Sequence, residues 1–128
     1  MKKILVFLFV ATLGFVAQAQ EKKAVIKFDT EEIDYGTIEQ GADGLRVFKF
    51  TNVGTAPLVI SNATSTCGCT VPSFSREPIA PGAKGEIQVK YNTNNIGAIR
   101  KTITVTSNAE TPTVALRIKG TVQPKTQK

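Results

Sequence analysis

Histidine and tryptophan are both absent from this chain of 128 residues, and its single methionine is Met1. Without histidine there is no Ser–His or Cys–His nucleophile pair and no imidazole general base. The imidazole ligand that zinc and copper sites often use is missing as well. These absences exclude hydrolases of the triad type and metal centres built on histidine.

An excess of one charge sign is also lacking over the body of the chain. The formal net charge is +6, but Lys2 and Lys3 contribute to it from the extreme N-terminus. Between Ala24 and Pro124 the basic residues are scattered singly and acidic residues nearly balance them. Proteins that bind nucleic acids concentrate lysine and arginine on one face, with aromatic residues between them. The sequence therefore predicts no nucleic-acid partner.

The first 19 residues have the pattern of a secretory signal peptide. Lys2-Lys3 precede an apolar run from Ile4 to Val16, and Ala17-Gln18-Ala19 is the small-x-small pattern that a signal peptidase cleaves. We expect cleavage between Ala19 and Gln20. The apolar run is shorter than the roughly 20 residues that a membrane-spanning helix needs. No later segment is apolar enough to span a membrane, so we expect export to the periplasm or the cell surface.

From Ala24 onward apolar residues recur with a period of two, which indicates half-buried strands. Ile87, Val89 and Tyr91 alternate with charged and polar residues, and turns rich in Gly, Pro and Asn separate this run from its neighbours. The pattern predicts an all-β fold, a single antiparallel Ig-like β-sandwich of about seven strands over residues 24–124, with a flexible tail at 125–128. The predicted core also contains Ile26, Phe28, Ile33, Tyr35, Phe48, Phe50, Leu58, Ile60, Ile99, Ile103, Val105, Val114, Leu116, Ile118 and Val122.

Several short motifs resemble a known family. They are Tyr35-Gly36-Thr37-Ile38, Phe48-x-Phe50-x-Asn52-x-Gly54, Ser65-Thr66-Cys67-Gly68-Cys69-Thr70, Pro81-Gly82-x-x-Gly85, Tyr91-x-Thr93 and Ser107-Asn108. The first two resemble the opening of Hydin-type immunoglobulin-like domains, and the whole set resembles the exported bacterial family called domain of unknown function 1573. The resemblance implies a seven-stranded Ig-like sandwich in the periplasm or at the cell surface. It implies no established activity.

Cys67-Gly68-Cys69 contains the only two cysteines, and it is the one cluster in the sequence whose side chains suggest reactivity or metal binding. Polar residues precede it, and Pro72 follows it with no N–H to donate to a strand ladder. We therefore expect a loop over Thr64–Ser73, at one rim of the sandwich. Its motif residues are Thr66, Cys67, Gly68, Cys69, Thr70 and Pro72.

The residue pattern leaves several roles open for this pair. A local disulfide would stabilise the fold by only about 1.6 kcal/mol, because the loop that it closes is so short. An extended backbone would also hold the two Cα atoms at the upper limit for a bridge, unless Gly68 adopts angles that other residues avoid. A labile bridge suits redox exchange. Two thiolates of Cys67 and Cys69 could hold Cu(I), although no further soft ligand is in sight. Free thiols or a cross-link between chains complete the alternatives, and no cofactor is predicted.

Taken together, the sequence predicts an exported, non-enzymatic, Ig-like binding or structural module of the bacterial cell envelope. Its partner would be a protein or another envelope component, contacted at a strand edge or at the rim loop. The alternative is a thiol redox or Cu(I)-handling protein that acts through Cys67 and Cys69.

Overall fold

The computed structural model describes residues 22–125, which form eight strands and no helix. The strands are β1 (Ile26–Phe28), β2 (Glu32–Glu39), β3 (Leu45–Asn52), β4 (Ile60–Ser65), β5 (Thr70–Ser73), β6 (Lys84–Tyr91), β7 (Gly97–Ser107) and β8 (Thr113–Gln123). The cleavage site predicted at Ala19 and Gln20 and most of the predicted tail lie outside the described residues. Within them, no helix of the length and apolarity needed to cross a membrane occurs.

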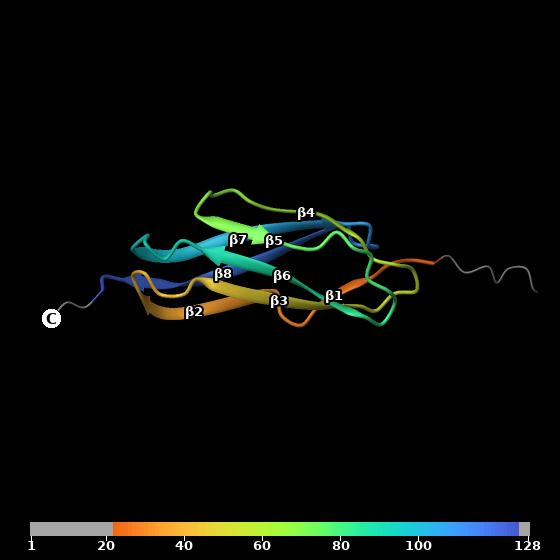
Figure 1. Ribbon diagram of the computed structural model, residues 1–128, viewed down its shortest axis with the longest axis horizontal. Coiled ribbons are helices and arrows are strands. Elements are labelled where there is room, and N and C mark those ends of the chain that lie inside the picture. The colour runs from red at the N-terminus through yellow and green to blue at the C-terminus, as the bar shows by residue number, and fades with distance from the viewer. Residues whose placement is uncertain (1–21, 126–128) are drawn as a thin grey trace, which may run out of the picture.

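The strands form two four-stranded sheets packed face to face (Figure 1). One sheet has the order β1-β3-β6-β5 and the other the order β2-β8-β7-β4. This is the two-layer arrangement of immunoglobulin-like sandwiches, so the predicted fold class is confirmed. Most connections cross from one sheet to the other, whereas β5–β6 and β7–β8 are each joined within one sheet, and the connections lie at the two ends of the sandwich.

The structure differs from the expected topology at the first edge. Six pairings join the strands, and the one between β2 and β8 is parallel. The reason is a change of sheet after β1: the chain crosses at residues 29–31 and then runs alongside β8 in the same direction. The opening segment therefore supplies two strands rather than one, which makes eight instead of about seven.

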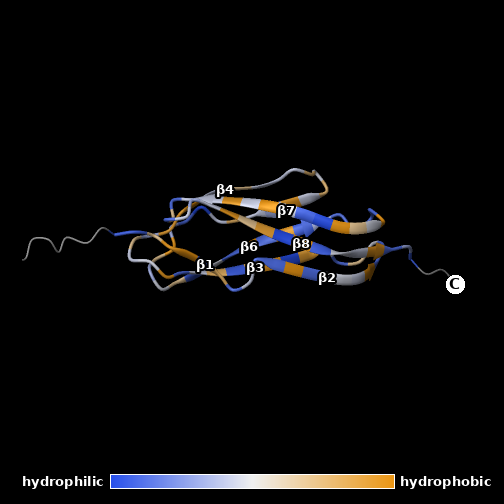
Figure 2. Ribbon diagram, turned by 180° about the vertical axis from the view of Figure 1, so that it is seen from behind, coloured by the Kyte–Doolittle hydropathy of each residue, from blue (hydrophilic) through white to orange (hydrophobic). Residues whose placement is uncertain are grey.

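The core follows the alternation that the sequence predicts. Along β6, Ile87, Val89 and Tyr91 are buried, while the residues between them face solvent. Figure 2 shows the same alternation of apolar and polar residues along the strands of the sandwich. Of the core residues predicted from the sequence, Ile26, Ile33 and Val114 are only half-buried and pack against the core, and all the others are buried. Phe48, Leu58, Ile87, Val89, Ile103 and Leu116 are completely enclosed.

The predicted loop Thr64–Ser73 is mostly strand, which corrects the expectation. Thr64 and Ser65 end β4, and β5 begins at Thr70, so only residues 66–69 connect the two sheets. Pro72 lies within β5 opposite Val89. It is tolerated because β5 is an edge strand: on the side without a neighbouring strand, the missing N–H of proline breaks no ladder hydrogen bond.

One buried amide fixes the end of the sandwich where the described chain begins. Asn52, at the end of β3, is fully buried, and its Oδ1 accepts hydrogen bonds from the backbone N–H groups of Val25 (3.3 Å) and Gly54 (2.9 Å). Its Nδ2 donates to the backbone oxygens of Ala56 (2.8 Å) and Ile79 (2.9 Å). Asn52 therefore satisfies four main-chain groups at once, and this motif residue has a structural role.

Candidate functional site

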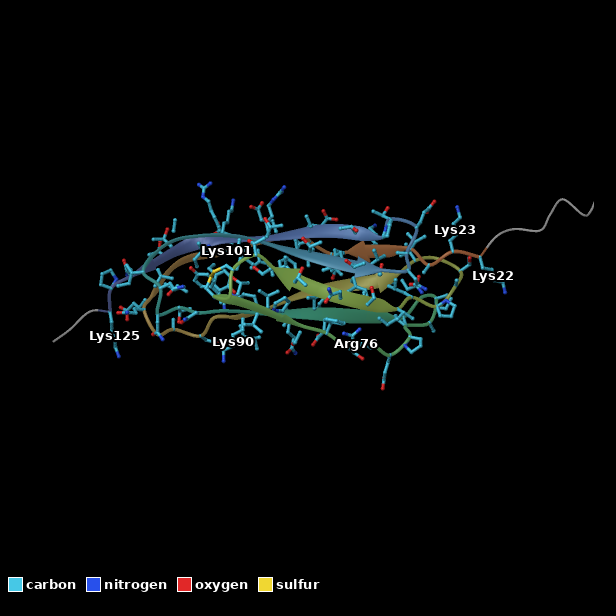
Figure 3. The ribbon with its side chains drawn as sticks, turned by 90° about the horizontal axis from the view of Figure 1, so that it is seen from above. Lys22, Lys23, Arg76, Lys90, Lys101 and Lys125 are labelled. Carbon is cyan, nitrogen blue, oxygen red and sulfur yellow. A yellow bond between two sulfur atoms is a disulfide. The ribbon has the colours of Figure 1, made fainter. Side chains whose placement is uncertain are left out.

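The Cys-Gly-Cys motif lies at the opposite end of the sandwich, which we call the disulfide end. Three connections form it: residues 40–44 between β2 and β3, 66–69 between β4 and β5, and 92–96 between β6 and β7. In Figure 3 the yellow sulfur–sulfur bond lies toward the end that carries Lys125, away from Lys22 and Lys23. The predicted position at one rim is therefore what the structure shows.

Cys67 and Cys69 are joined in a disulfide, and their Cα atoms are 5.2 Å apart. This separation is within the usual range for a bridge. It arises because the segment turns: the N–H of Thr70 donates to the carbonyl of Cys67 at 3.1 Å. An extended backbone, which would have kept the cysteines farther apart, is not present here.

Gly68 does not have the role that the sequence suggested for it. It is not among the described glycines with positive φ, and a Cβ added to it would meet no atom within 4 Å. The turn needs neither a left-handed residue nor a close approach at this position. The expectation that Gly68 relieves the bridge through unusual backbone angles is wrong, because the turn itself brings the cysteines together.

The two sulfur atoms have different surroundings. The Sγ of Cys67 accepts a hydrogen bond from the N–H of Cys69 at 3.1 Å. The Sγ of Cys69 is 3.6 Å from the hydroxyl of Thr70, which is buried, and Cys69 packs against the hydrophobic core. The preceding Thr66 is exposed. The two sulfur atoms of the bridge therefore differ, because a backbone N–H of the turn donates to the Sγ of Cys67.

Main-chain and side-chain hydrogen bonds hold the disulfide end in shape. The N–H of Asn92 donates to the carbonyl of Cys69 at 2.8 Å, which ties the motif to the end of β6. The hydroxyl of Thr93 donates to the carbonyl of Ala42 at 2.6 Å, and Thr93 is buried. Residues 40–44 and 66–69 are thus both fastened to the segment that follows β6.

Tyr35 on β2 adds a further hydrogen bond to this frame, by which we mean the hydrogen-bonded connections 40–44, 66–69 and 92–96. Its hydroxyl donates to the carbonyl of Gly44 at 2.6 Å, and a side chain at Gly44 would collide with the carbonyl oxygen of Tyr91. Burial raises the pKa of Tyr35 above its usual value, against the opposing effect of the Arg46 guanidinium, which lies 4.2 Å from the centre of the ring. A buried phenol that donates to a carbonyl serves the frame rather than acid–base chemistry.

A hollow of about 590 Å³ opens beside the disulfide, and we call it the rim hollow. It is lined by Gly68 and Cys69 from the motif, by Val71 and Lys90 from the adjoining strands, and by Asp43 and Asn94 from the other two connections, among others. Cys67 is not part of its lining. Of the two cysteines, a molecule in the hollow therefore contacts Cys69.

Exposed apolar side chains concentrate around the rim hollow. Four large hydrophobic residues in the described part of the chain are exposed, and three of them are at this end: Leu45 (41%), Val71 (59%) and Ile96 (53%). Leu45 and Val71 both pair with Lys90, from opposite sides, so the three side chains form one row across the outer face of the sheet. The fourth, Val53 (53%), is at the opposite end.

Sequence reasoning missed one residue, Lys101 on β7. The inward positions of β7 are Ile99, Ile103 and Val105, all buried, and Lys101 takes the inward position between the first two. The β4–β7 ladder ends at the pair Ser65–Ile103, and Lys101 is the next inward position of β7 beyond it, on the side toward which the chain continues into the Cys67 turn. In the view of Figure 3, Lys101 lies at the same end of the sandwich as the sulfur–sulfur bond. The period-two pattern places Lys101 on the inward face, but it does not show that the turn with the disulfide lies at this end of β7.

Arg76, the basic residue nearest to the motif in sequence, has other contacts. Its Nη1 donates to the carbonyl of Ser61 at 2.7 Å, and its guanidinium lies 5.0 Å from the ring centre of Phe74.

Residues 22–125 contain no group of three or more His, Cys, Asp or Glu side chains arranged to hold a metal ion. The Cu(I) alternative would therefore rest on Cys67 and Cys69 alone.

Comparison with known proteins places this fold and these motifs in one family. Residues 26–122 match the model of the family described as "Protein of unknown function (DUF1573)". The chain belongs to this family. The match extends from β1 to the end of β8, so it includes the Cys-Gly-Cys turn and both ends of the sandwich. A comparison with curated proteins found no match.

Solved structures share the fold at low sequence identity. A protein of unknown function from Porphyromonas gingivalis W83 is 18% identical with a TM-score of 0.69, over 84% of this chain and 51% of its own. The ASH/PapD-like domain 7 of human CEP192 is 11% identical with a TM-score of 0.67, over 90% of this chain and 98% of its own. The Pseudomonas aeruginosa CupB2 chaperone is 7% identical with a TM-score of 0.55, over 77% and 55%. The chain thus spans about half the length of the Porphyromonas protein, and these likenesses concern the fold alone.

Proposed function

We propose that this protein is an exported, non-enzymatic binding module of the cell envelope that docks a protein partner at its disulfide end. The signal-like sequence before Gln20 supports export. The Ig-like and PapD-like fold supports a binding or structural role, and one of the structural neighbours is named as a chaperone, a class of proteins that bind other proteins.

The observation that carries the proposal is the concentration of exposed apolar side chains at one end. Val71 lines the rim hollow, Leu45 and Ile96 lie at the same end of the sandwich, and the hydrogen bonds of Tyr35 and Thr93 fix the walls of the hollow. Exposed apolar groups next to a concave surface are typical of protein interaction sites. A rigid frame favours binding further, because little conformational freedom is lost when the partner docks.

Contact through the rim is favoured over addition of a strand to a sheet edge. The edges of the first sheet are β1, with three residues, and β5, with four residues including Pro72. Short edges that contain proline resist pairing with another strand. On the second sheet, the edges β2 and β4 are longer, but the register of β2 shifts between Asp34 and Thr37 and that of β4 between Ile60 and Asn62. An added strand would lose its hydrogen-bond ladder at such an irregularity.

The test compares two exposed valines at opposite ends of the molecule. A photo-cross-linking amino acid replaces Val71 in one variant and Val53 in the other, and both are expressed in the native bacterium. We expect a discrete cross-linked protein from position 71 that is absent from position 53. The yield from position 71 should fall when Leu45 and Ile96 are changed to serine. Equal yields from the two valines, or none from position 71, would contradict rim docking.

Export is tested separately by fractionating the cells and determining the N-terminus of the protein. We expect the protein in the envelope fraction with Gln20 as its first residue. Recovery from the cytoplasm with Met1 or Lys2 at its start would contradict export.

Thiol–disulfide exchange is the second candidate function. The specific observation that favours it is the hydrogen bond from the N–H of Cys69 to the Sγ of Cys67. A donor directed at one sulfur of a partly exposed bridge prepares that sulfur to leave with negative charge.

A further inference from the structure

We propose that the Cys67–Cys69 bridge is a thiol–disulfide exchange site with a fixed direction, in which an incoming thiolate attacks Cys69 and Cys67 leaves. This activity goes beyond partner binding, and it does not depend on the apolar residues around the rim. Access, hydrogen bonding and charge each support it independently.

Access favours attack on Cys69. The rim hollow is lined by Cys69 and Gly68, and Cys67 is not part of the lining. Gly68 has open space where a side chain would stand, so the approach past the middle of the motif is clear. An exchange reaction needs the attacking sulfur in line with the bond that breaks, and of the two cysteines only Cys69 lines the hollow from which a thiolate can approach.

Hydrogen bonding favours Cys67 as the leaving sulfur. The N–H of Cys69 donates a hydrogen bond to the Sγ of Cys67 at 3.1 Å. This donor belongs to the turn that the hydrogen bond from the N–H of Thr70 to the carbonyl of Cys67 closes. A hydrogen bond to a charged form stabilises it. The Sγ of Cys69 lies 3.6 Å from the Thr70 hydroxyl, which could equally be the acceptor.

Charge favours the same direction. The half-buried Lys101 is the first inward position of β7 beyond the last β4–β7 pair, Ser65–Ile103, and Cys67 follows two residues after Ser65. We infer that the flexible four-carbon stem of Lys101 brings its ammonium toward the Sγ of Cys67. An ammonium close to a thiolate lowers the pKa of the thiol and makes it a better leaving group.

The other charged groups near the motif lie on the Cys69 side. Lys90 on β6 and Asp43 in the 40–44 connection line the rim hollow, and their opposite charges partly offset each other. The four residues of β5 include no charged side chain, and neither do the last residues of β4. Lys101 is therefore the charge that distinguishes the two sulfurs.

The reaction consumes two thiol groups of a partner, which is a thiol or dithiol protein of the same compartment. In the first step a partner thiolate forms a bond to Cys69 Sγ, the Cys67–Cys69 bond breaks, and Cys67 leaves with the electron pair. In the second step another partner thiolate attacks the mixed disulfide, and Cys69 leaves. The bridge gains two electrons and two protons, and the partner is oxidised to a disulfide.

The first experiment uses the purified protein and 2-mercaptoethanol as a neutral thiol probe. The reaction is stopped early by alkylation, and mass spectrometry of the peptides locates the mercaptoethanol adduct and the alkylated cysteine. We expect the adduct on Cys69 and the alkyl group on Cys67. An adduct mainly on Cys67, or equally on both, would overturn the proposed direction.

The second experiment measures the pH dependence of alkylation at each cysteine of the reduced protein. We expect Cys67 to react at lower pH than Cys69, and Lys101→Met to move the Cys67 profile upward by about one pH unit. The same change should slow opening of the bridge by about threefold, because the leaving thiol has a higher pKa. Lys101→Arg, which keeps the charge, should behave as the unaltered protein, and thermal unfolding verifies that each variant is folded.

Lys90→Met is the matched control, since it removes the same charge at the same end but on the outer face. We expect it to leave the Cys67 profile unchanged. An equal shift in Lys90→Met and Lys101→Met, or no shift in Lys101→Met, would show that Lys101 does not distinguish the sulfurs and would overturn the proposal. Neither experiment depends on partner docking, so rim docking can fail while directional exchange holds.

Discussion

Replacing Asn52 with alanine should be among the most destabilising single changes on this sandwich outside the apolar core. The side chain is fully buried and makes four hydrogen bonds to main-chain groups. Alanine leaves a space lined by two N–H donors and two carbonyl oxygens. The change therefore removes partners from polar groups in a region with little water.

The magnitude follows from which of the four groups keep another partner. The carbonyl of Ile79 retains the hydrogen bond that it accepts from Leu58 N–H at 2.9 Å, so its loss is small. The N–H groups of Val25 and Gly54 both lose their acceptor. An unsatisfied buried donor costs about 1–3 kcal/mol, so two of them destabilise the fold by about 3 kcal/mol. For a domain of this size that lowers Tm by about 15 °C.

Urea unfolding and calorimetry of Asn52→Ala measure this loss directly. Asn62→Ala is the matched control, because Asn62 is exposed and its amide oxygen accepts only from the adjacent N–H of Ala63 at 3.0 Å. We expect it to change stability by less than about 0.5 kcal/mol. If Asn52→Ala cost less than about 1 kcal/mol, the reasoning about unsatisfied groups would be refuted.

Asn52→Asp adds a pH signature to the same test. An ionised aspartate would direct negative oxygen at the carbonyls of Ala56 and Ile79, which now accept from Nδ2. The folded state therefore raises the pKa of this carboxyl above its unfolded value of about 3.9. A raised pKa favours the protonated form in the native state, so the variant should be most stable below about pH 4 and lose stability as the pH rises. Stability that is constant between pH 3 and pH 7, relative to the unaltered protein, would contradict this.

Three further predictions concern the disulfide end. Gly44→Ala should destabilise the fold by more than 1 kcal/mol, measured by urea unfolding, because the added Cβ meets a main-chain carbonyl oxygen of β6, whereas Gly68→Ala should be nearly neutral because its Cβ meets open space. The double change of Cys67 and Cys69 to serine should cost at most about 1.6 kcal/mol, since the bridge closes a loop of only three residues; a loss above about 3 kcal/mol would make the bridge a structural support. Because the folded state raises the pKa of Tyr35, the contribution of this phenol to folding stability is present below about pH 10 and is lost as the pH rises through the folded pKa. Tyr35→Phe should therefore remove that part of the alkaline destabilisation in pH-dependent melting curves.

The long strands could be predicted from the sequence because burial on one face imposes a period of two. β6, β7 and β8 each show this alternation over at least eight residues, and their buried positions are the predicted ones. A register error of one residue would expose the whole apolar face, so the pattern and the pairing specify each other.

The features that could not be predicted depend on partners far away in the sequence. β5 has four residues, one of them proline, and it is a strand only because β6 supplies the hydrogen bonds. The parallel pairing of β2 depends on β8, which is distant in the chain. The position of Lys101, just beyond the end of the β4–β7 ladder, likewise needs the pairing of these two strands. Local composition contains none of these relations, and only the sheet topology brings them together.

The residues that carry the family resemblance divide according to what they do in the fold. Asn52 closes one end of the sandwich, and Tyr35 and Thr93 fix the connections at the other, so their roles are structural. Cys67-Gly68-Cys69 differs from all of them. Its glycine meets no close neighbour, its bridge spans two residues, and a loop this short adds little to stability. A bridge that adds so little to stability and lies next to an open hollow is what the proposed exchange with a partner thiol requires.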